Sequence, residues 1–197
     1  MERETISETG KAWEHRNREG FFIYCQGKGI DIGPGNYPPV VETADSWDYC
    51  LGHGDAQLMQ GVPDDTYDYV YTSALLEHMT NPTVAIANWW RILKTGGYLI
   101  LFVPQAYLFE RKQLLEFPID LSERHKFWIL PDRSRPPHIF GLLDIVNAAL
   151  GDAPREFKYM KLCDAGWFPT TYPEVANPPG EYMIELVIQK GQRGGDL

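Results

Sequence analysis

The stretch that decides the fold runs from residue 29 to residue 35 and reads Gly29-Ile30-Asp31-Ile32-Gly33-Pro34-Gly35. A short apolar run that ends in glycines predicts a buried strand followed by a tight turn. Glycines at such a turn let the backbone approach a ligand at the carboxyl edge of a sheet, although a purely structural turn can have the same sequence. The stretch therefore predicts the first strand of a sheet, with either a ligand loop or a structural turn at its end.

Strands and helices alternate downstream of this turn. Residues 68–73 are rich in β-forming side chains and predict a strand. A helix is expected next, because Asn81 is a good N-cap and Pro82 suits the first helical position. Residues 98–103 form a continuous apolar run, which is typical of a strand buried on both faces of a parallel sheet. The alternation predicts an α/β fold.

The remaining segments are less regular. Residues 104–137 mix charges, aromatic side chains and prolines without a clear period, so we interpret them as a lid or acceptor-site insertion. Residues 138–150 predict a helix, and residues 157–162 predict a strand. In residues 182–188 large apolar side chains recur at every second position, and this period of two predicts an antiparallel edge strand. We interpret residues 1–27 as an N-terminal helical extension.

Length, charge and cysteine content exclude several classes of protein. The chain has 197 residues and a net charge of −9, which predicts one domain over residues 1–197 and counts against a nucleic-acid partner. No apolar run reaches the roughly 18 residues of a membrane span, and no signal-peptide core is present, so we expect a cytoplasmic protein. The three cysteines are far apart and have no metal-ligand spacing, so we expect no metal.

Carboxylates near the predicted strand ends suggest a nucleoside ligand. Asp31 fits a cationic ligand better than a pyrophosphate, and Pro38 occupies the position where a dinucleotide fold needs its third glycine. A second strand starting at Val40 would end near Asp45, whose carboxylate could accept both hydroxyls of a ribose; Asp48 is the competing candidate. A turn or helix-capping role for either aspartate has about equal weight.

A third carboxylate and the end of another predicted strand are expected at the same carboxyl edge of the sheet. Asp55, in Gly54-Asp55-Ala56, follows a predicted short strand and could accept from the exocyclic amine of a purine, although this tripeptide is also a common turn. Residues 72–78 lead from the strand into a helix, so their backbone and hydroxyl groups would face the same crevice.

Five motifs in this order resemble the class I S-adenosylmethionine-dependent methyltransferases, and most closely their type 11-like branch. They are Asp-Ile-Gly-Pro-Gly (31–35), Gly-Asp-Ala (54–56), Pro-Asp-Asp-Thr-Tyr-Asp-Tyr-Val-Tyr-Thr-Ser (63–73), Leu-Leu-Glu-His-Met (75–79) and Arg-Ile-Leu-Lys-Thr-Gly-Gly-Tyr-Leu (91–99). The resemblance covers about residues 28–104. It implies a Rossmann-like, seven-stranded and mostly parallel sheet with an antiparallel last strand and helices on both faces.

The resemblance also implies a cofactor, S-adenosylmethionine, and a place for each site residue. Its methionine end would be lined by Asp31, Gly33, Pro34 and Gly35. Asp45 would meet the ribose, the pair Asp55 and Ala56 would meet the adenine, and Ser73 would lie under the cofactor. The implied activity is methyl transfer to oxygen or nitrogen of a small-molecule or glycan-precursor acceptor.

The general base of such a transfer has two candidates. His125 lies in the predicted lid among charged residues and is the first choice, because imidazole titrates near neutrality; His78 is the second. A surface role for His125 and a structural hydrogen bond for His78 are the competing interpretations. Two further hypotheses stay open, namely a non-catalytic scaffold with this fold and a nicotinamide oxidoreductase. A homodimer also stays open.

Overall fold

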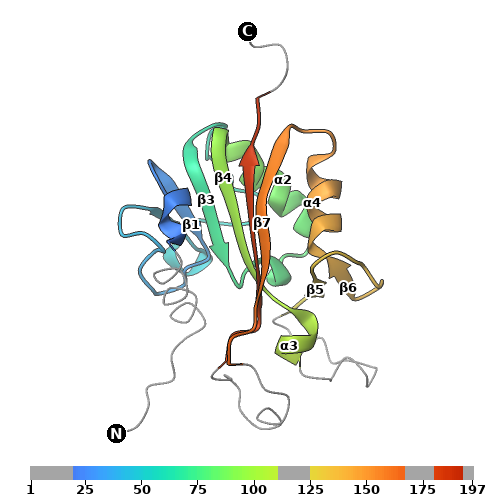
Figure 1. Ribbon diagram of the computed structural model, residues 1–197. Coiled ribbons are helices and arrows are strands. Elements are labelled where there is room, and N and C mark those ends of the chain that lie inside the picture. Colours follow the sequence, from blue (N-terminus) through green and yellow to red (C-terminus); the bar gives the residue numbers. More distant parts are fainter. Residues whose placement is uncertain (1–19, 111–124, 167–179, 193–197) are drawn as a thin grey trace, which may run out of the picture.

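The computed structural model describes residues 20–110, 125–166 and 180–192. Its largest element is a six-stranded sheet with the order β2-β1-β3-β4-β8-β7 (Figure 1). The strands are β1 (Gly29–Ile32), β2 (Asp45–Trp47), β3 (Tyr67–Ser73), β4 (Leu93–Pro104), β7 (Arg155–Cys163) and β8 (Met183–Lys190). Strands β1 to β4 run parallel, and β8 is antiparallel to both of its neighbours. The predicted α/β fold with an antiparallel last strand is confirmed.

The predicted strand count and strand bounds need correction. Within the described residues the main sheet has six strands rather than seven, because the segment before Gly54 forms the 3-10 helix η2 (Tyr49–Leu51). The side chain of Asp48 caps η2 by accepting a hydrogen bond from the backbone N–H of Cys50, and the left-handed Gly52 ends it. Strand β2 starts at Asp45, so the prediction that a strand starts at Val40 and ends near Asp45 is wrong.

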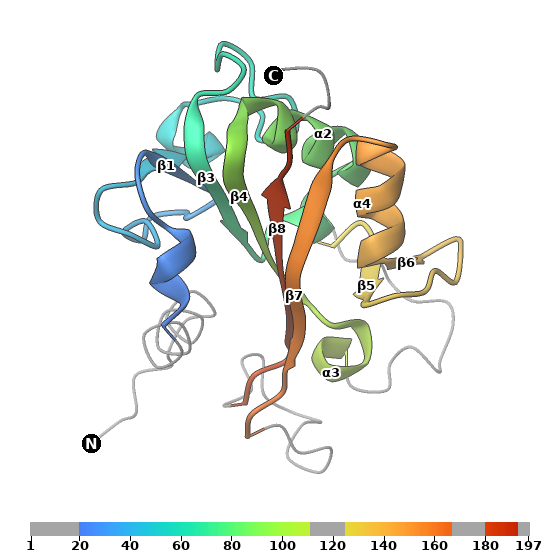
Figure 2. The ribbon, with the colours of Figure 1, turned by 45° about the horizontal axis from the view of Figure 1, so that its top comes forward.

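The last strand does not lie at the edge of the sheet. β8 lies between β4 and β7, and its first six residues are buried on both faces. The strand at this edge is β7, as Figure 2 shows. The period of two in β8 reflects alternation between two apolar environments, which the sequence pattern could not distinguish from alternation between core and solvent.

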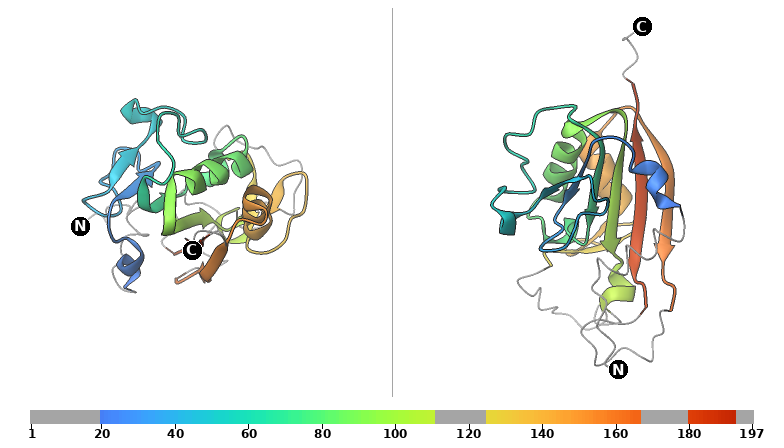
Figure 3. Two further views of the ribbon diagram at one scale, coloured as in Figure 1. Left: turned by 90° about the horizontal axis from the view of Figure 1, so that it is seen from above. Right: turned by 90° about the vertical axis from the view of Figure 1, so that its left-hand side faces the viewer.

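The long helices cover one face of the sheet. Helix α2 (Pro82–Ile92) and helix α4 (Leu142–Leu150) pack against each other on the same side (Figure 3). The Asn81 side chain accepts a hydrogen bond from the backbone N–H of Val84 at 3.1 Å, so the predicted N-cap is confirmed. Trp89 is fully buried in this layer, and its indole N–H donates to the carbonyl of Ala56 at 2.9 Å.

The opposite face has a smaller core. Tyr69, Tyr71 and Ile100 form it with Phe21, which belongs to the 3-10 helix η1 (Phe21–Tyr24). Among the described residues, η1 lies on this face, opposite α2 and α4 (Figure 3). Residues 1–19 of the predicted N-terminal extension lie outside the described residues.

Short elements surround the carboxyl edge of the parallel strands. The 3-10 helix η3 (Leu76–His78) follows β3, and helix α3 (Ala106–Glu110) follows β4 at the lower edge in Figure 1. Strands β5 (Trp128–Leu130) and β6 (Ile139–Gly141) pair in parallel, so part of the segment predicted as helix 138–150 is a strand. The lid prediction for residues 104–137 includes 111–124, which are not described, and it stays a prediction. In the described ranges, no helix is long and apolar enough to cross a membrane.

Candidate cofactor and acceptor site

The glycine turn after β1 has the backbone that its sequence predicts. Gly33 has a φ of +84° and its N–H donates to the carbonyl of Trp47 at 2.8 Å, which joins the turn to β2. A Cβ atom on Gly33 would come within 2.8 Å of the Leu75 side chain. Gly35 has a φ of +64°, and a Cβ atom there would meet no atom within 4 Å. The turn is therefore tightly packed at Gly33, while Gly35, beyond the buried Pro34, faces open space.

Asp31 lies within β1 and is 2% exposed. It pairs with Tyr71 of β3 on the sheet face that carries η1. One carboxylate oxygen accepts a hydrogen bond from the backbone N–H of Val40 at 2.7 Å, which fixes the chain where it returns from the glycine turn. Asp31 thus holds the loop in place, and its charge lies at the base of that loop.

The two ribose candidates lie at opposite ends of β2. Asp45 is its first residue; its carboxylate accepts from the Tyr67 hydroxyl at 3.0 Å, and Lys28 Nζ is 3.8 Å away. Burial raises the pKa of Tyr67 to about 12, and the hydrogen bond to Asp45 adds to the shift, so the phenol stays a donor. Asp48 follows the strand, and its Oδ2 accepts from the N–H of Gly35 at 2.9 Å. Asp48, and not Asp45, lies beside the glycine turn.

Asp55 and Ala56 form a turn rather than the end of a strand. The Asp55 side chain accepts from the backbone N–H of Gln57 at 2.7 Å, and its carbonyl accepts from the N–H of Met59 at 3.0 Å. Asp55 is exposed, whereas Ala56 packs against the main core. The adenine role of this pair stays a prediction.

Ser73 ends β3 at the same edge. It pairs with Phe102 of β4 and is 9% exposed. Its hydroxyl is buried and has no hydrogen-bond partner among the residues that the structure describes. Such a group costs free energy unless a ligand or water satisfies it.

The two predicted base candidates, His78 in η3 and His125, come together in the structure. The imidazole rings of His78 and His125 meet edge to face with their centroids 5.0 Å apart. The ring of His125 also stacks on Phe109 at 5.0 Å. Lys126, next to His125, donates its backbone N–H to the carbonyl of Glu77 at 2.8 Å, which joins this segment to η3. Two histidines that lie 47 residues apart in the sequence thus share one site.

Glu77 is the member of this site that sequence reasoning missed. It is 1% exposed, and its Oε1 lies 3.8 Å from His78 Nε2. Burial raises the pKa of the Glu77 carboxyl to about 7, while the charge of His125 acts in the opposite direction. The available signal in the sequence was a glutamate next to a histidine after a predicted buried strand. In the structure Leu76 and Glu77 are both buried, and nothing in the sequence distinguishes the buried acid from an exposed one.

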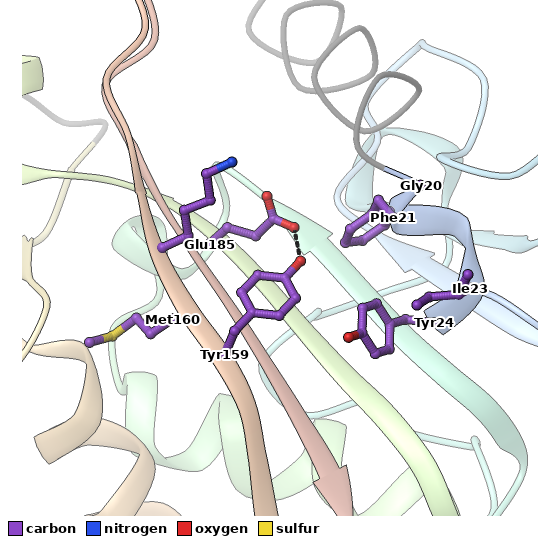
Figure 4. A pocket seen from close by; sticks show the side chains of 8 residues that line it. Gly20, Phe21, Ile23, Tyr24, Tyr159, Met160 and Glu185 are labelled. Carbon is purple, nitrogen blue, oxygen red and sulfur yellow. Dashed lines mark hydrogen bonds between the residues drawn. The ribbon is translucent and has the colours of Figure 1, made fainter.

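A separate hollow of about 310 Å³ lies on the η1 face of the sheet. Figure 4 shows Tyr159 and Tyr24 on either side of it, with Glu185 between the strands and η1. The buried Glu185 carboxylate accepts from the Tyr159 hydroxyl. This hydrogen bond offsets part of the free-energy cost of burying the Glu185 carboxylate. None of the predicted site residues lines the hollow.

The carboxyl edge fits the cofactor that the sequence resemblance implies. The open space at Gly35 leaves room for a ligand against the backbone, and the unsatisfied hydroxyl of Ser73 offers it a polar contact. Each oxygen of Asp48 already accepts one N–H, from Gly35 or Cys50, but a carboxylate oxygen can accept a second bond. The separation from Asp31 to Asp48 is 48 − 31 = 17 residues, close to the usual spacing of about 20.

Comparisons with known proteins agree with this fold. Residues 9–101 match a family model described as a methyltransferase domain. No curated protein matches the sequence. Among solved structures, a SAM-dependent methyltransferase from Thermotoga maritima aligns with a TM-score of 0.57 at 16% identity, covering 91% of this chain and 89% of the other.

Two archaeal structures are similar to the same degree. A SAM-dependent methyltransferase from Methanosarcina mazei aligns with a TM-score of 0.56 at 17% identity, over 89% of this chain and 98% of the other. A SAM-dependent methyltransferase from Archaeoglobus fulgidus aligns with a TM-score of 0.53 at 16% identity, over 93% and 95%. At these identities the structures show the shared fold. Together with the family model over residues 9–101, they show that the chain carries a methyltransferase domain with the fold of S-adenosylmethionine-dependent methyltransferases.

Proposed function

We propose that this methyltransferase moves the methyl group of S-adenosylmethionine to oxygen or nitrogen of a small-molecule or glycan-precursor acceptor. The observation that carries the proposal is the meeting of His125 with His78, which lies in η3 directly after β3. Imidazole is the usual general base near neutral pH, and two imidazoles here supply proton-accepting groups where an acceptor would approach the methyl group.

The cofactor residues proposed from the sequence stay the same with one exchange. Asp31, Gly33, Pro34 and Gly35 would form the loop around the methionine end. Asp48 replaces Asp45 at the ribose, because Asp48 contacts the Gly35 N–H whereas Asp45 bonds to Tyr67 at the amino end of β2. At the far end Asp55 and Ala56 would meet the adenine, and Ser73 would lie under the cofactor.

Methyl transfer to oxygen requires alignment of the reacting atoms and one proton acceptor. The lone pair of an acceptor oxygen forms the new bond to the methyl carbon, and the electrons of the carbon–sulfur bond go to sulfur, which leaves as neutral S-adenosylhomocysteine. Holding nucleophile, carbon and sulfur in line supplies most of the rate. An oxygen acceptor also loses a proton, which we assign to His125, with His78 and the buried Glu77 stabilising the resulting charge.

A methyl-transfer screen tests this proposal. The protein is incubated with S-adenosylmethionine that carries a labelled methyl group and with panels of phenols, sugars, sugar nucleotides and amines. We expect label in at least one acceptor, with equimolar S-adenosylhomocysteine. Cofactor binding without transfer to any acceptor class would contradict the proposal and favour the non-catalytic scaffold.

The assignment of the ribose contact to Asp48 rather than Asp45 has a direct test. Asp48→Asn is expected to weaken S-adenosylmethionine binding about tenfold, because a charged acceptor is lost both for the ribose hydroxyls and for the Gly35 N–H. Asp45→Asn is the matched control, since it changes the same group three residues away, and we expect an affinity within about twofold of the parent. Titration calorimetry measures both; the reverse order of effects would restore Asp45 to the ribose.

A further inference from the structure

The side chains of Glu77, His78 and His125, named here the EHH cluster, offer the donor atoms of a metal site. One nitrogen of each imidazole and one carboxylate oxygen lie within 4.8 Å of one another. Two imidazoles and one carboxylate are a common ligand set for zinc and other divalent transition metals. We propose that the EHH cluster binds a divalent transition-metal ion, with zinc as the best fit.

One pair of donor atoms lies close to the spacing of a formed site, while the set as a whole spans up to 4.8 Å. Bonds of about 2.0–2.2 Å to a tetrahedral zinc place neighbouring donor atoms about 3.3–3.6 Å apart. Glu77 Oε1 and His78 Nε2 are already 3.8 Å apart, so this pair needs only a small contraction. The side chain of His78 is 34% exposed, which gives it freedom to move and leaves an open side for a water ligand.

The buried carboxylate of Glu77 is an independent indication of a cation. Glu77 is 1% exposed, and its Oε2 has no hydrogen-bond partner among the described residues. A carboxylate removed from water is costly unless it meets a positive charge or a metal. Because Oε1 of the same carboxylate lies 3.8 Å from His78 Nε2, an ion bound there would place a positive charge beside the buried group.

The backbone and the aromatic surroundings hold the ligands together without the metal. Glu77 and His78 are neighbours in η3, and the Lys126 N–H bonds to the Glu77 carbonyl at 2.8 Å, which brings His125 to the cluster. Phe109 covers one face of the His125 ring. The ligands are therefore brought together by contacts that do not depend on an ion, as a binding site requires.

Metal binding has a consequence for catalysis that rests on the proposed function. A nitrogen that coordinates a metal has donated its lone pair and cannot accept the proton of an acceptor hydroxyl. Zinc at the EHH cluster would therefore inhibit methyl transfer to oxygen, and a chelator would restore it. Metal binding itself does not depend on any methyl-transfer activity.

The test is a titration of the chelator-treated full chain with Zn²⁺ by calorimetry and with Co²⁺ by visible absorption. We expect one ion per chain with micromolar or tighter affinity, and visible Co²⁺ bands that Zn²⁺ abolishes. His78→Ala, His125→Ala and Glu77→Gln should each weaken binding at least tenfold. His138→Ala, which removes a histidine outside the cluster, should leave it unchanged.

Two results would overturn the proposal. One is the absence of binding by the parent chain, and the other is binding that survives all three cluster substitutions, which would place the ion elsewhere. If Glu77→Gln does not fold, the two histidine variants still decide the question. Because these readouts need no acceptor, a failed acceptor screen would contradict the proposed function and leave the metal site standing.

Discussion

Gly33→Ala is expected to weaken S-adenosylmethionine binding at least tenfold. The residue has a φ of +84°, a conformation that costs an L-residue roughly 1–2 kcal/mol. Its new Cβ atom would also lie 2.8 Å from the Leu75 side chain, so either this side chain or the turn must shift. We expect relief of the backbone strain to move the Gly35 N–H relative to Asp48 and to disturb the loop where we place the cofactor. A loss of about 1.4 kcal/mol in binding corresponds to a tenfold loss of affinity.

Gly61→Ala is the matched control for this substitution. Gly61 has the same φ of +84°, but a Cβ atom there would meet nothing within 4 Å. Both variants should lose thermal stability through backbone strain, whereas only Gly33→Ala should lose cofactor affinity in titration calorimetry. Equal losses of affinity in the two variants would show a general effect of destabilisation and would contradict the loop assignment.

His125→Ala is expected to lower turnover about 10²–10⁴-fold with an oxygen acceptor, which is the usual contribution of a general base. The affinity for S-adenosylmethionine should stay unchanged, because we place no cofactor contact on this side chain. Steady-state kinetics with an acceptor from the screen and calorimetry with the cofactor measure the two quantities separately.

His138→Ala controls for the loss of a histidine in the same part of the chain. The ring of His138 packs edge to face on Trp128 and is not part of the EHH cluster, so turnover should be close to that of the parent. If His125→Ala turns over as fast as His138→Ala, His125 has no part in the mechanism. A combined loss of turnover and cofactor affinity would instead indicate that residue 125 supports the cofactor loop.

Features set by local chemistry could be predicted from the sequence. The N-cap at Asn81 and the glycine turn after β1 depend on a few neighbouring residues, and both form as expected. The antiparallel last strand was predicted from the family resemblance and a period of two, and it is present as β8. Its interior place in the sheet was not, because burial on both faces depends on strand β7 and on packing that the pattern does not contain.

Features set by register and tertiary contacts could not be predicted. Asp45 was placed at the wrong end of β2, because its position follows from pairing with Ile30 and from the bond to Tyr67, both distant in sequence. The meeting of Glu77 with His125 depends on a backbone contact from Lys126 to Glu77, which are 126 − 77 = 49 residues apart. The individual histidines could be proposed as bases, but their shared site and its third member required the fold.

Titration calorimetry of the full chain with S-adenosylmethionine, S-adenosylhomocysteine and NAD tests the central claim most directly. The claim is that the edge formed by the glycine turn, Asp48 and Ser73 is built for the sulfur cofactor. We expect micromolar binding of S-adenosylmethionine and S-adenosylhomocysteine, one molecule per chain, and no heat with NAD. Binding of NAD in their place, or no binding of either sulfur compound, would contradict the assignment of this edge as the cofactor site.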